Sequence, residues 1–411
     1  MADPIIRPAN VAVLIKLETV EGEDANPTGA LDAIPVEADS VEYNSPYSQE
    51  QSNEATGSLV GGAPLIIGQA ATISFRSQIK GAGAGVTYSA TVKPPLHQAL
   101  QACGKRGLFT AGVAAAAITA GSATSATLAA AFPGTAKALI GMPLEITAGI
   151  GIGRRPTVVD YTAGRVATLA ESFATPLDTS SQIALLANWS YAGTSPRDQA
   201  ARATDHPSAT IYIYEDGTLL KFVACRGVVT GDGQTARVGF AAFNFTGIYM
   251  GKTDAALPSD LAIASHSAPT LVQSSSASQV VLLDRKPLPI STWSLNNGGE
   301  VESPEDPNTP FGFGSGQIGE RVPQLQFDPL ATLVAVRDIT ADIGIGRQMS
   351  AVVRCGTVIG NSWAWTLPRA QPVENTPGRR GRFRSEQITL QALSAGLDAQ
   401  LRDTESVLTF F

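Results

Sequence analysis

Charged residues are scarce in this chain, and their scarcity limits the functions that the composition allows. Asp, Glu, Lys and Arg make up 16% of the 411 residues, and the formal net charge is −7. Because soluble proteins average about a quarter charged residues, this composition suits a large core or a surface covered by other copies of the chain. The acidic balance argues against a protein that grips nucleic acid, since tight phosphate binding needs clustered Lys and Arg.

Histidine and cysteine are also rare, which removes several kinds of reactive site. The histidines are His97, His206 and His266, and no zinc-protease, serine-hydrolase or P-loop motif is present. The acidic residues are scattered, so no close pair indicates acid–base chemistry or a metal cage. We therefore expect no enzyme, no cofactor and no metal. An odd number of cysteines without C-x-x-C spacing predicts reduced, buried thiols: Cys103, Cys225 and Cys355.

Long apolar runs are missing as well. The apolar stretch at residues 11–17 is short and contains Lys16, so it is not typical of a secretory signal. The Ala-rich residues 111–131 are interrupted by Thr, Ser and Gly, so we do not expect them to span a membrane. The sequence predicts a protein that is made in a cytoplasm and has no membrane partner.

Two short runs resemble ligand-binding motifs but have simpler interpretations. Gly149-Ile-Gly-Ile-Gly153 precedes Arg154 and Arg155, and we interpret it as a hairpin turn with solvated arginines, because a lone glycine repeat is weak evidence for phosphate binding. The basic residues 379–384 lie at a predicted hairpin flanked by Glu374 and Glu386. They suit an exposed turn, or a partner for acidic loops of another subunit.

Most of the recognisable pattern has a period of two, which predicts strands with one buried face. Two predicted strands meet at Glu215-Asp216-Gly217, a strong hairpin signal because both turn positions need positive φ. A third strand is expected to return through Gly231-Asp232-Gly233. Its aromatic residues move from an even position, Phe240, to the odd positions of Phe243 and Phe245. This switch predicts a β-bulge near Ala241-Ala242. The apolar positions that carry these strands are Ile73, Phe75, Ile79, Ile211, Ile213, Val238, Phe240, Phe243 and Phe245.

One helix is predicted at residues 94–104. Two prolines open it, and Gly104 provides a natural end. Its apolar residues Leu96, Ala99, Leu100 and Cys103 follow helical spacing, which indicates an amphipathic helix of about three turns lying on a sheet.

The second half of the sequence is predicted to repeat this order of elements. Leu288-Pro289-Ile290 matches Ile34-Pro35-Val36 as an opening strand, and long polar loops follow at residues 43–62 and 296–320. Strands at Ile73 and Phe75 match Leu325 and Phe327. A second helix is expected to begin at Asp328-Pro329. The remaining members of the second copy are Leu330, Leu333 and Val334 in that helix, Trp363, Trp365 and Leu367 matching Ile211 and Ile213, and Ile388, Leu390 and Ala392 after a hairpin at residues 378–384.

Three units follow from this repeat. Residues 1–107 and 193–265 form the first domain, and residues 266–411 form the second. Residues 108–192 separate the first helix from its following strand, and we interpret them as an inserted small all-β module. Its predicted strands are residues 125–130, 144–147, 157–161, 166–169 and 183–189.

The order of these elements, with several stretches of sequence, resembles the tail tube (major tail) proteins of siphophages, the long-tailed bacteriophages with non-contractile tails. The stretches are residues 16–29 (KLETVEGEDANPTG), 94–104 (PPLHQALQACG), 217–227 (GTLLKFVACRG), 245–249 (FTGIY) and 253–258 (TDAALP). The resemblance covers about three quarters of the chain, everything except the insertion. No single stretch is a sharp signature, and the specificity comes from their order.

The resemblance implies two tandem β-sandwich or barrel domains of the tail-tube type, each with a flanking helix. It implies a virion protein whose copies close into rings and stack into a tube, the conduit for viral DNA ejection. The internal repeat favours three-fold rings with pseudo-six-fold symmetry over hexamers, with the inserted module outside the tube. The implied partners are other copies of the chain, the tape measure protein and viral DNA in the lumen, and the tail terminator and tail tip proteins.

Ring closure pairs free sheet edges with the next subunit, and stacking needs arms that reach another ring. The two polar loops suit that role, and their aromatic residues Tyr43, Tyr47, Phe311 and Phe313 are candidates for inter-ring contacts. The alternative is that these aromatic side chains pack on their own domain. An acidic lumen would repel the duplex and keep it centred, and the net charge permits one.

Two other function classes remain open. One is another phage tail component, such as a terminator or decoration protein, which would not polymerise into long tubes. The other is a β-rich module that binds glycans or surfaces, suggested by the insertion and its Trp189-Ser-Tyr191.

Overall fold

The protein is mainly β. A computed structural model describes residues 5–7, 9–55, 57, 59–265, 268–272 and 280–411. Strands hold 45% of the residues and helices 7%, which confirms the predicted fold class at this level. His266 lies outside the described residues.

The first half of the chain forms an antiparallel sheet. Across this sheet the strands pair in the order β2–β1–β16–β17–β18–β6–β3. The predicted hairpin is confirmed, because Asp216 and Gly217 join β16 to β17 with φ values of 40° and 101°. The elements of this half are β1 (Val11–Leu17), α1 (Gly29–Asp32), β2 (Ala33–Ile34), η1 (Ala38–Ser40), β3 (Glu42–Tyr43), β4 (Tyr47–Glu50), β5 (Leu65–Gly68), β6 (Ala71–Gln78), α2 (His97–Ala102), α3 (Gln199–Asp205), β16 (Ala209–Glu215), β17 (Thr218–Gln234), β18 (Gly239–Asp254) and η2 (Ala262–Ser265).

The second half repeats both the chain order and the pairing order. Its strands pair as β20–β19–β25–β26–β27–β24–β21. A small hairpin (β4–β5 or β22–β23) and a short helix (α2 or α4) occupy matching places in the two halves. Its elements are β19 (Val281–Leu283), β20 (Lys286–Pro287), β21 (Thr292–Asn296), β22 (Val301–Glu302), β23 (Gln317–Ile318), β24 (Gln324–Phe327), α4 (Ile339–Gly344), β25 (Met349–Cys355), β26 (Trp363–Arg380), β27 (Phe383–Ala392) and β28 (Asp403–Phe410).

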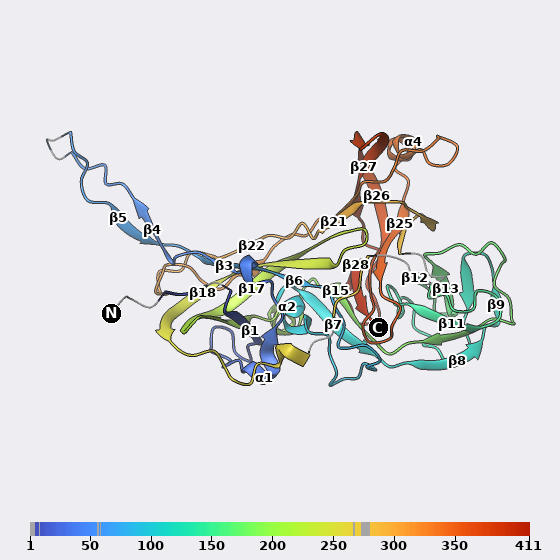
Figure 1. Cartoon of the computed structure of the whole chain (residues 1–411), viewed down its shortest axis with the longest axis horizontal. Coiled ribbons are helices and arrows are strands. Elements are labelled where there is room, and N and C mark those ends of the chain that lie inside the picture. The colour runs from blue at the N-terminus through green and yellow to red at the C-terminus, as the bar shows by residue number, and fades with distance from the viewer. Residues whose placement is uncertain (1–4, 8, 56, 58, 266–267, 273–279) are drawn as a thin grey trace.

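The two halves join into one continuous sheet. The end of β17 pairs with β21 from Thr230↔Asn296 to Gln234↔Thr292, so the sheet runs from the first half into the second without a break (Figure 1). One large hydrophobic cluster lies behind both halves. It contains the stacked rings of Phe75, Phe243 and Phe245.

The inserted residues fold around a separate hydrophobic cluster, at the end of the molecule away from the β4–β5 hairpin (Figure 1). β7 (Lys105–Thr110) and β15 (Asn188–Gly193) pair with each other, and β15 also pairs with β28 of the second half. Residues 183–189, predicted as one strand, hold the ends of two. The strands between β7 and β15 form two small sheets: β8 (Val113–Ala117), β9 (Ala120–Gly121), β10 (Ser125–Thr127), β11 (Leu144–Ala148), β12 (Val158–Tyr161), β13 (Val166–Leu169) and β14 (Gln182–Leu185).

A buried ion cluster ties the insertion to the second half. The Glu171 side chain is fully buried and lies 2.6 Å from the Arg354 guanidinium of β25 and 3.0 Å from that of Arg154. The arginines after the glycine repeat were predicted to be solvated, and that prediction was wrong: Arg154 pairs with Glu171, and Arg155 lies 2.8 Å from Glu145.

The first predicted helix is confirmed as α2, although it spans six residues instead of about three turns. The second was misplaced. The Asp328 carboxylate does not cap a helix but accepts hydrogen bonds from the backbone N–H groups of Ser291 and Thr292, both at 2.7 Å. The helix α4 begins after Asp338, whose side chain accepts from the Ala341 N–H. Leu333 and Val334, expected on its buried face, are 78% and 73% exposed.

Several strand predictions also need correction. The ladder between β6 and β18 runs without a shift past Ala241-Ala242, so the bulge predicted there is absent. Phe240 lies on the opposite face, where the Arg76 guanidinium stacks on its ring at 3.8 Å. Gly231-Asp232-Gly233 continues β17, and the turn comes at residues 235–237. Leu288-Pro289-Ile290 was predicted as a strand, but these residues form none, and the next strand is β21. Trp363 was predicted to match β16, but it begins β26, which matches β17.

Candidate self-association surfaces

The most exposed apolar feature is a hairpin that projects from the body, which we call the arm (residues 47–68). Its strands β4 and β5 pair from Tyr47↔Gly68 to Glu50↔Leu65, and it extends away from the first half (Figure 1). Of the polar loop predicted over residues 43–62, residues 47–50 form the strand β4 of this hairpin, and the described residues from 51 to 62 carry no strand. Leu65 is 56% exposed, Ile66 66% and Leu59 fully exposed. Exposed apolar hairpins of this kind mark interaction sites.

An aromatic cluster anchors the base of the arm. The ring of Tyr47 lies 5.3 Å from that of Phe311, which lies 6.0 Å from the ring of Tyr249. A Cβ at Gly68 would lie 2.1 Å from the Phe311 carbonyl oxygen, so only glycine permits this approach. The structure thus brings Tyr47 and Phe311 together within one chain, across the two predicted domains.

The other two candidate contact residues lie apart from that cluster. The Tyr43 hydroxyl donates a hydrogen bond of 3.0 Å to Glu215. Burial and this bond raise the pKa of Tyr43 to about 12, so it remains a neutral donor. Phe313 is half-buried and forms a β-bridge with Glu305. That any of the four residues contacts a neighbouring ring of subunits remains a prediction.

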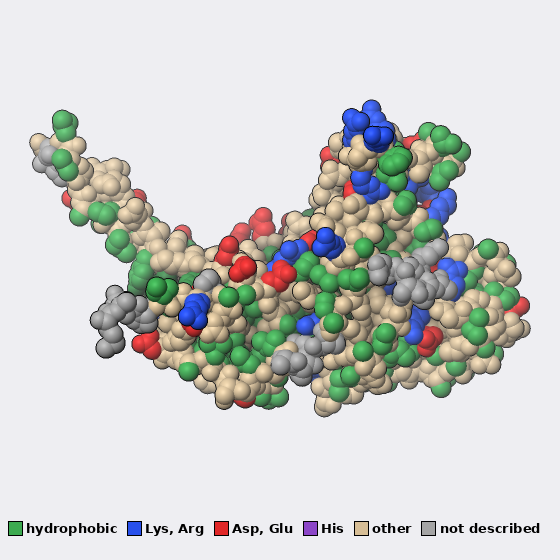
Figure 2. Space-filling view, viewed as in Figure 1, with side chains coloured by type: hydrophobic (Ala, Val, Ile, Leu, Met, Phe, Trp, Pro, Cys, Tyr) green, Lys and Arg blue, Asp and Glu red, His purple; other side chains and the backbone are tan. Residues whose placement is uncertain are grey.

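A second surface is the tip of the β26–β27 hairpin. Its side chains Arg379, Arg382 and Arg384, which we call the basic tip, are all exposed. Figure 2 shows a dense group of basic side chains over this end of the β26–β27 hairpin. Phe383 between them is 68% exposed. The predicted hairpin is confirmed, since Arg380 pairs with Phe383.

A third surface is the face of the sheet opposite the core, which we call the polar face. Directly opposed residues form two rows across the seven strands β6, β18, β17, β21, β24, β27 and β26, and most carry amides or hydroxyls. The charges of Arg76 and Asp232 are paired with each other. The rows are Arg76, Ala242, Thr230, Asn296, Gln324, Gln391 and Gln371, and Gln78, Phe240, Asp232, Ser294, Gln326, Thr389 and Glu374.

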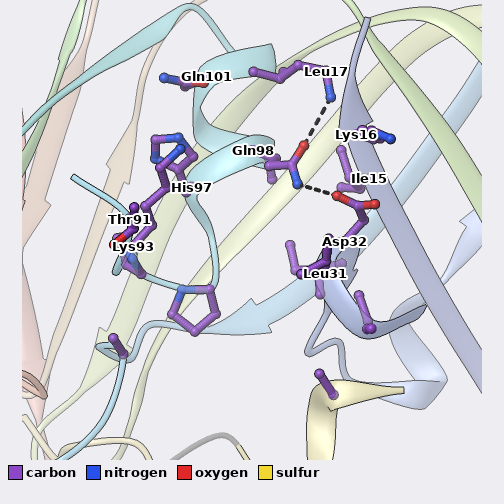
Figure 3. A pocket seen from close by; sticks show the side chains of 18 of the residues that line it. Ile15, Lys16, Leu17, Leu31, Asp32, Thr91, Lys93, His97, Gln98 and Gln101 are labelled. Carbon is purple, nitrogen blue, oxygen red and sulfur yellow. Dashed lines mark hydrogen bonds between the residues drawn. The ribbon is translucent and has the colours of Figure 1, made fainter. Parts of the chain in front are cut away.

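A groove between β1, α1 and α2 is lined in part by a histidine, His97 (Figure 3). Its polar groups serve the fold. Gln98 accepts a hydrogen bond from the Leu17 N–H and donates one to Asp32. The His97 ring bonds the Tyr191 hydroxyl at 2.7 Å, and burial lowers the pKa of His97 to about 3, so the ring is neutral at ordinary pH.

The remaining predicted features fall within the core. All three cysteines are buried and unpaired, as predicted, and burial raises the pKa of each thiol. Trp189 and Tyr191, considered as a sugar-stacking pair, are 7% and 0% exposed. They therefore present no open aromatic surface to a glycan. Within the described residues there is no group of three His, Cys, Asp or Glu side chains placed to hold a metal ion.

Comparison with models of known protein families gave no match, and a search of the curated proteins gave none either. No helix in the described part of the chain is long and apolar enough to cross a membrane.

Proposed function

We propose that this protein is the building block of a siphophage tail tube, a virion protein whose copies close into rings that stack around a channel for viral DNA. The observation that carries the proposal is the duplicated strand order. Each half repeats one set of seven strands, one hairpin and one helix, and the halves join edge to edge. A unit that already joins to its own duplicate by a sheet edge suits cyclic assembly, in which the same junction recurs.

Three copies per ring would supply six such units, so we propose a trimer with pseudo-six-fold symmetry. The arm suits contact between stacked rings, because its apolar side chains are exposed and its base is fixed by Tyr47 and Phe311. The inserted module, attached through β7 and β15, would lie outside the tube. The expected partners are the tape measure protein and DNA inside, and the terminator and tip proteins at the ends.

The polar face suits a lining for passing DNA. A basic lumen would bind phosphates and release counterions, which gives affinity and therefore friction. Amides and hydroxyls, the Arg76–Asp232 ion pair and the negative charge of Glu374 offer DNA little net attraction. We therefore propose a nearly neutral lining along these two rows, although the net charge of the chain also permits an acidic one.

Negative-stain imaging of the purified protein at increasing concentration tests the proposal, together with native mass measurement of any rings. We expect long tubes of uniform diameter and rings of three chains. Rings that never stack would favour a terminator, and a solitary chain at every concentration would refute the tube.

A further inference from the structure

The junction between the two halves has an unused counterpart elsewhere in the chain. Inside the chain, residues 230–234 at the end of β17 pair with β21. The equivalent end of β26, residues 376–380, pairs with β27 on one side. Among the described residues, no strand pairs with its other side.

The complementary edge is also open. The strand equivalent to β21 is β3, which pairs with β6 through Glu42↔Ser74 and Tyr43↔Ile73. Within the described part of the chain, nothing pairs with its outer side. One copy therefore carries both members of a junction that it does not form.

Sequence equivalence supports this correspondence. Placing Phe327 of β24 on Phe75 of β6 carries the alignment to the neighbouring strands through the ladders. Thr230 then corresponds to Thr376, and Asn296 to Asn44. The internal junction opposes Thr230 and Asn296, and the two open edges carry the same two residue types at the corresponding positions.

The charges of the two open edges are complementary. In the equivalent register, Gly378 opposes Glu42, Arg379 opposes Val41 and Arg380 opposes Ser40, which places the basic tip close to the acidic stretch that precedes β3. That stretch contains Glu37 and Asp39. Figure 2 shows basic side chains at the hairpin and acidic side chains gathered on the first half near β3 and β22. Opposite charges across an interface fix register and steer encounter.

The chain that follows each edge strand fits the same pattern. After β21, residues 297–320 lie on β17 and β18 of the first half, where the Gly316 carbonyl accepts a hydrogen bond of 2.9 Å from Arg226. After β3, the corresponding segment contains the arm, which instead extends into solvent (Figure 1). By analogy with residues 297–320, the arm would lie against a second copy of the chain.

We propose that the outer edge of β3 in one copy pairs, antiparallel, with residues 376–380 of β26 in the next copy, in the register of the β17–β21 junction. This inference rests on the proposed ring and identifies the surface that closes it. Pro377 has no N–H to donate, whereas its counterpart Gly231 has one. A proline at an open edge also limits indiscriminate strand pairing.

Cysteine cross-linking tests the register, because directly opposed residues of antiparallel strands lie within disulfide range. We would mix Glu42→Cys chains with Gly378→Cys chains under mild oxidation. We expect covalent dimers from the mixture, no dimers from either variant alone, and species of up to three chains from the double variant. The native cysteines are buried and do not compete.

The internal junction supplies the matched control. Asp232 and Ser294 oppose each other within one chain at the equivalent positions, so Asp232→Cys with Ser294→Cys should form a disulfide inside each chain. If rings or tubes form while Glu42 and Gly378 do not cross-link, the inference is wrong and the proposed function survives. If Glu42→Cys links to itself, the contact is symmetric and the inference is wrong. If all variants stay monomeric while the control forms its disulfide, both proposals fail.

Discussion

Replacing Ile66 of the arm with serine should weaken tube formation without affecting the fold. Ile66 lies on β5 opposite Gln49 and is 66% exposed in the single chain. Stacking would bury this exposed part, whereas folding alone leaves it in water. The change therefore acts on assembly and not on the core.

The size of the effect follows from the exposed fraction. Complete burial of an isoleucine side chain contributes about 1.5–3 kcal/mol, so burial of two thirds of it contributes roughly 1.5 kcal/mol per chain. A ring of three chains would lose roughly 4.5 kcal/mol per ring-to-ring contact, which is about a thousandfold in the association constant. Side-chain relaxation would reduce this figure.

The assay is the critical concentration for tubes, measured by sedimentation and light scattering. Ile152→Ser is a matched control, because Ile152 is 64% exposed but lies in a turn of the inserted module. We expect the critical concentration to rise by about two to three powers of ten for Ile66→Ser and to stay unchanged for Ile152→Ser. Equal critical concentrations for the two variants would refute a stacking role for the arm.

Three further predictions concern the fold. Glu171→Gln neutralises the buried carboxylate that pairs with both Arg154 and Arg354. It should lower the free energy of unfolding by about 3–5 kcal/mol in chemical denaturation, more than Glu145→Gln at the less buried Arg155 pair; equal losses would contradict this. A hydrogen bond with Arg226 lowers the pKa of Glu21 from 4.5 to about 2, so this pair stabilises the fold above pH 4.5 and loses its effect as the pH falls to 2. Melting curves of Glu21→Gln should therefore depend less on pH across that window, and an unchanged dependence would count against the pair. Gly68→Ala places a methyl group against the Phe311 carbonyl and should loosen the base of the arm at a cost of about 1–3 kcal/mol, seen as faster proteolysis within residues 47–68.

The sequence was most informative where the signal was local. Asp216-Gly217 required a turn with positive φ, and the spacing of Leu96, Ala99, Leu100 and Cys103 required a helix with one buried face. Both predictions are confirmed because the residues that set the conformation lie next to each other. The pairing of β6 with β18 needs partners more than 160 residues apart, and no local pattern contains that information.

The errors have a shared physical cause. Asp328-Pro329 has the chemistry of a helix start, but the carboxylate is equally able to bind the N–H groups of Ser291 and Thr292, which tertiary packing brings to it. Phe240 was predicted to be a core residue, which required a bulge to bring it to the same face as Phe243. Its ring instead lies on the polar face, where the Arg76 guanidinium stabilises it. The apolar run Leu65-Ile66-Ile67, just after the predicted polar loop, was the available sign of a strand that pairs back with part of that loop.

Duplication within one chain gives a physical reason for two kinds of junction. Half of the six junctions in a three-copy ring would form during folding, because a covalent linker gives the second half a high effective concentration at the edge of β17. Those junctions need no charge to select their partner, and the charged residue there, Asp232, pairs with Arg76 of the same half. The remaining junctions must form between separate chains and exclude wrong partners. The basic tip, the acids before β3 and Pro377 are found at these edges, where steering and protection against indiscriminate pairing are required.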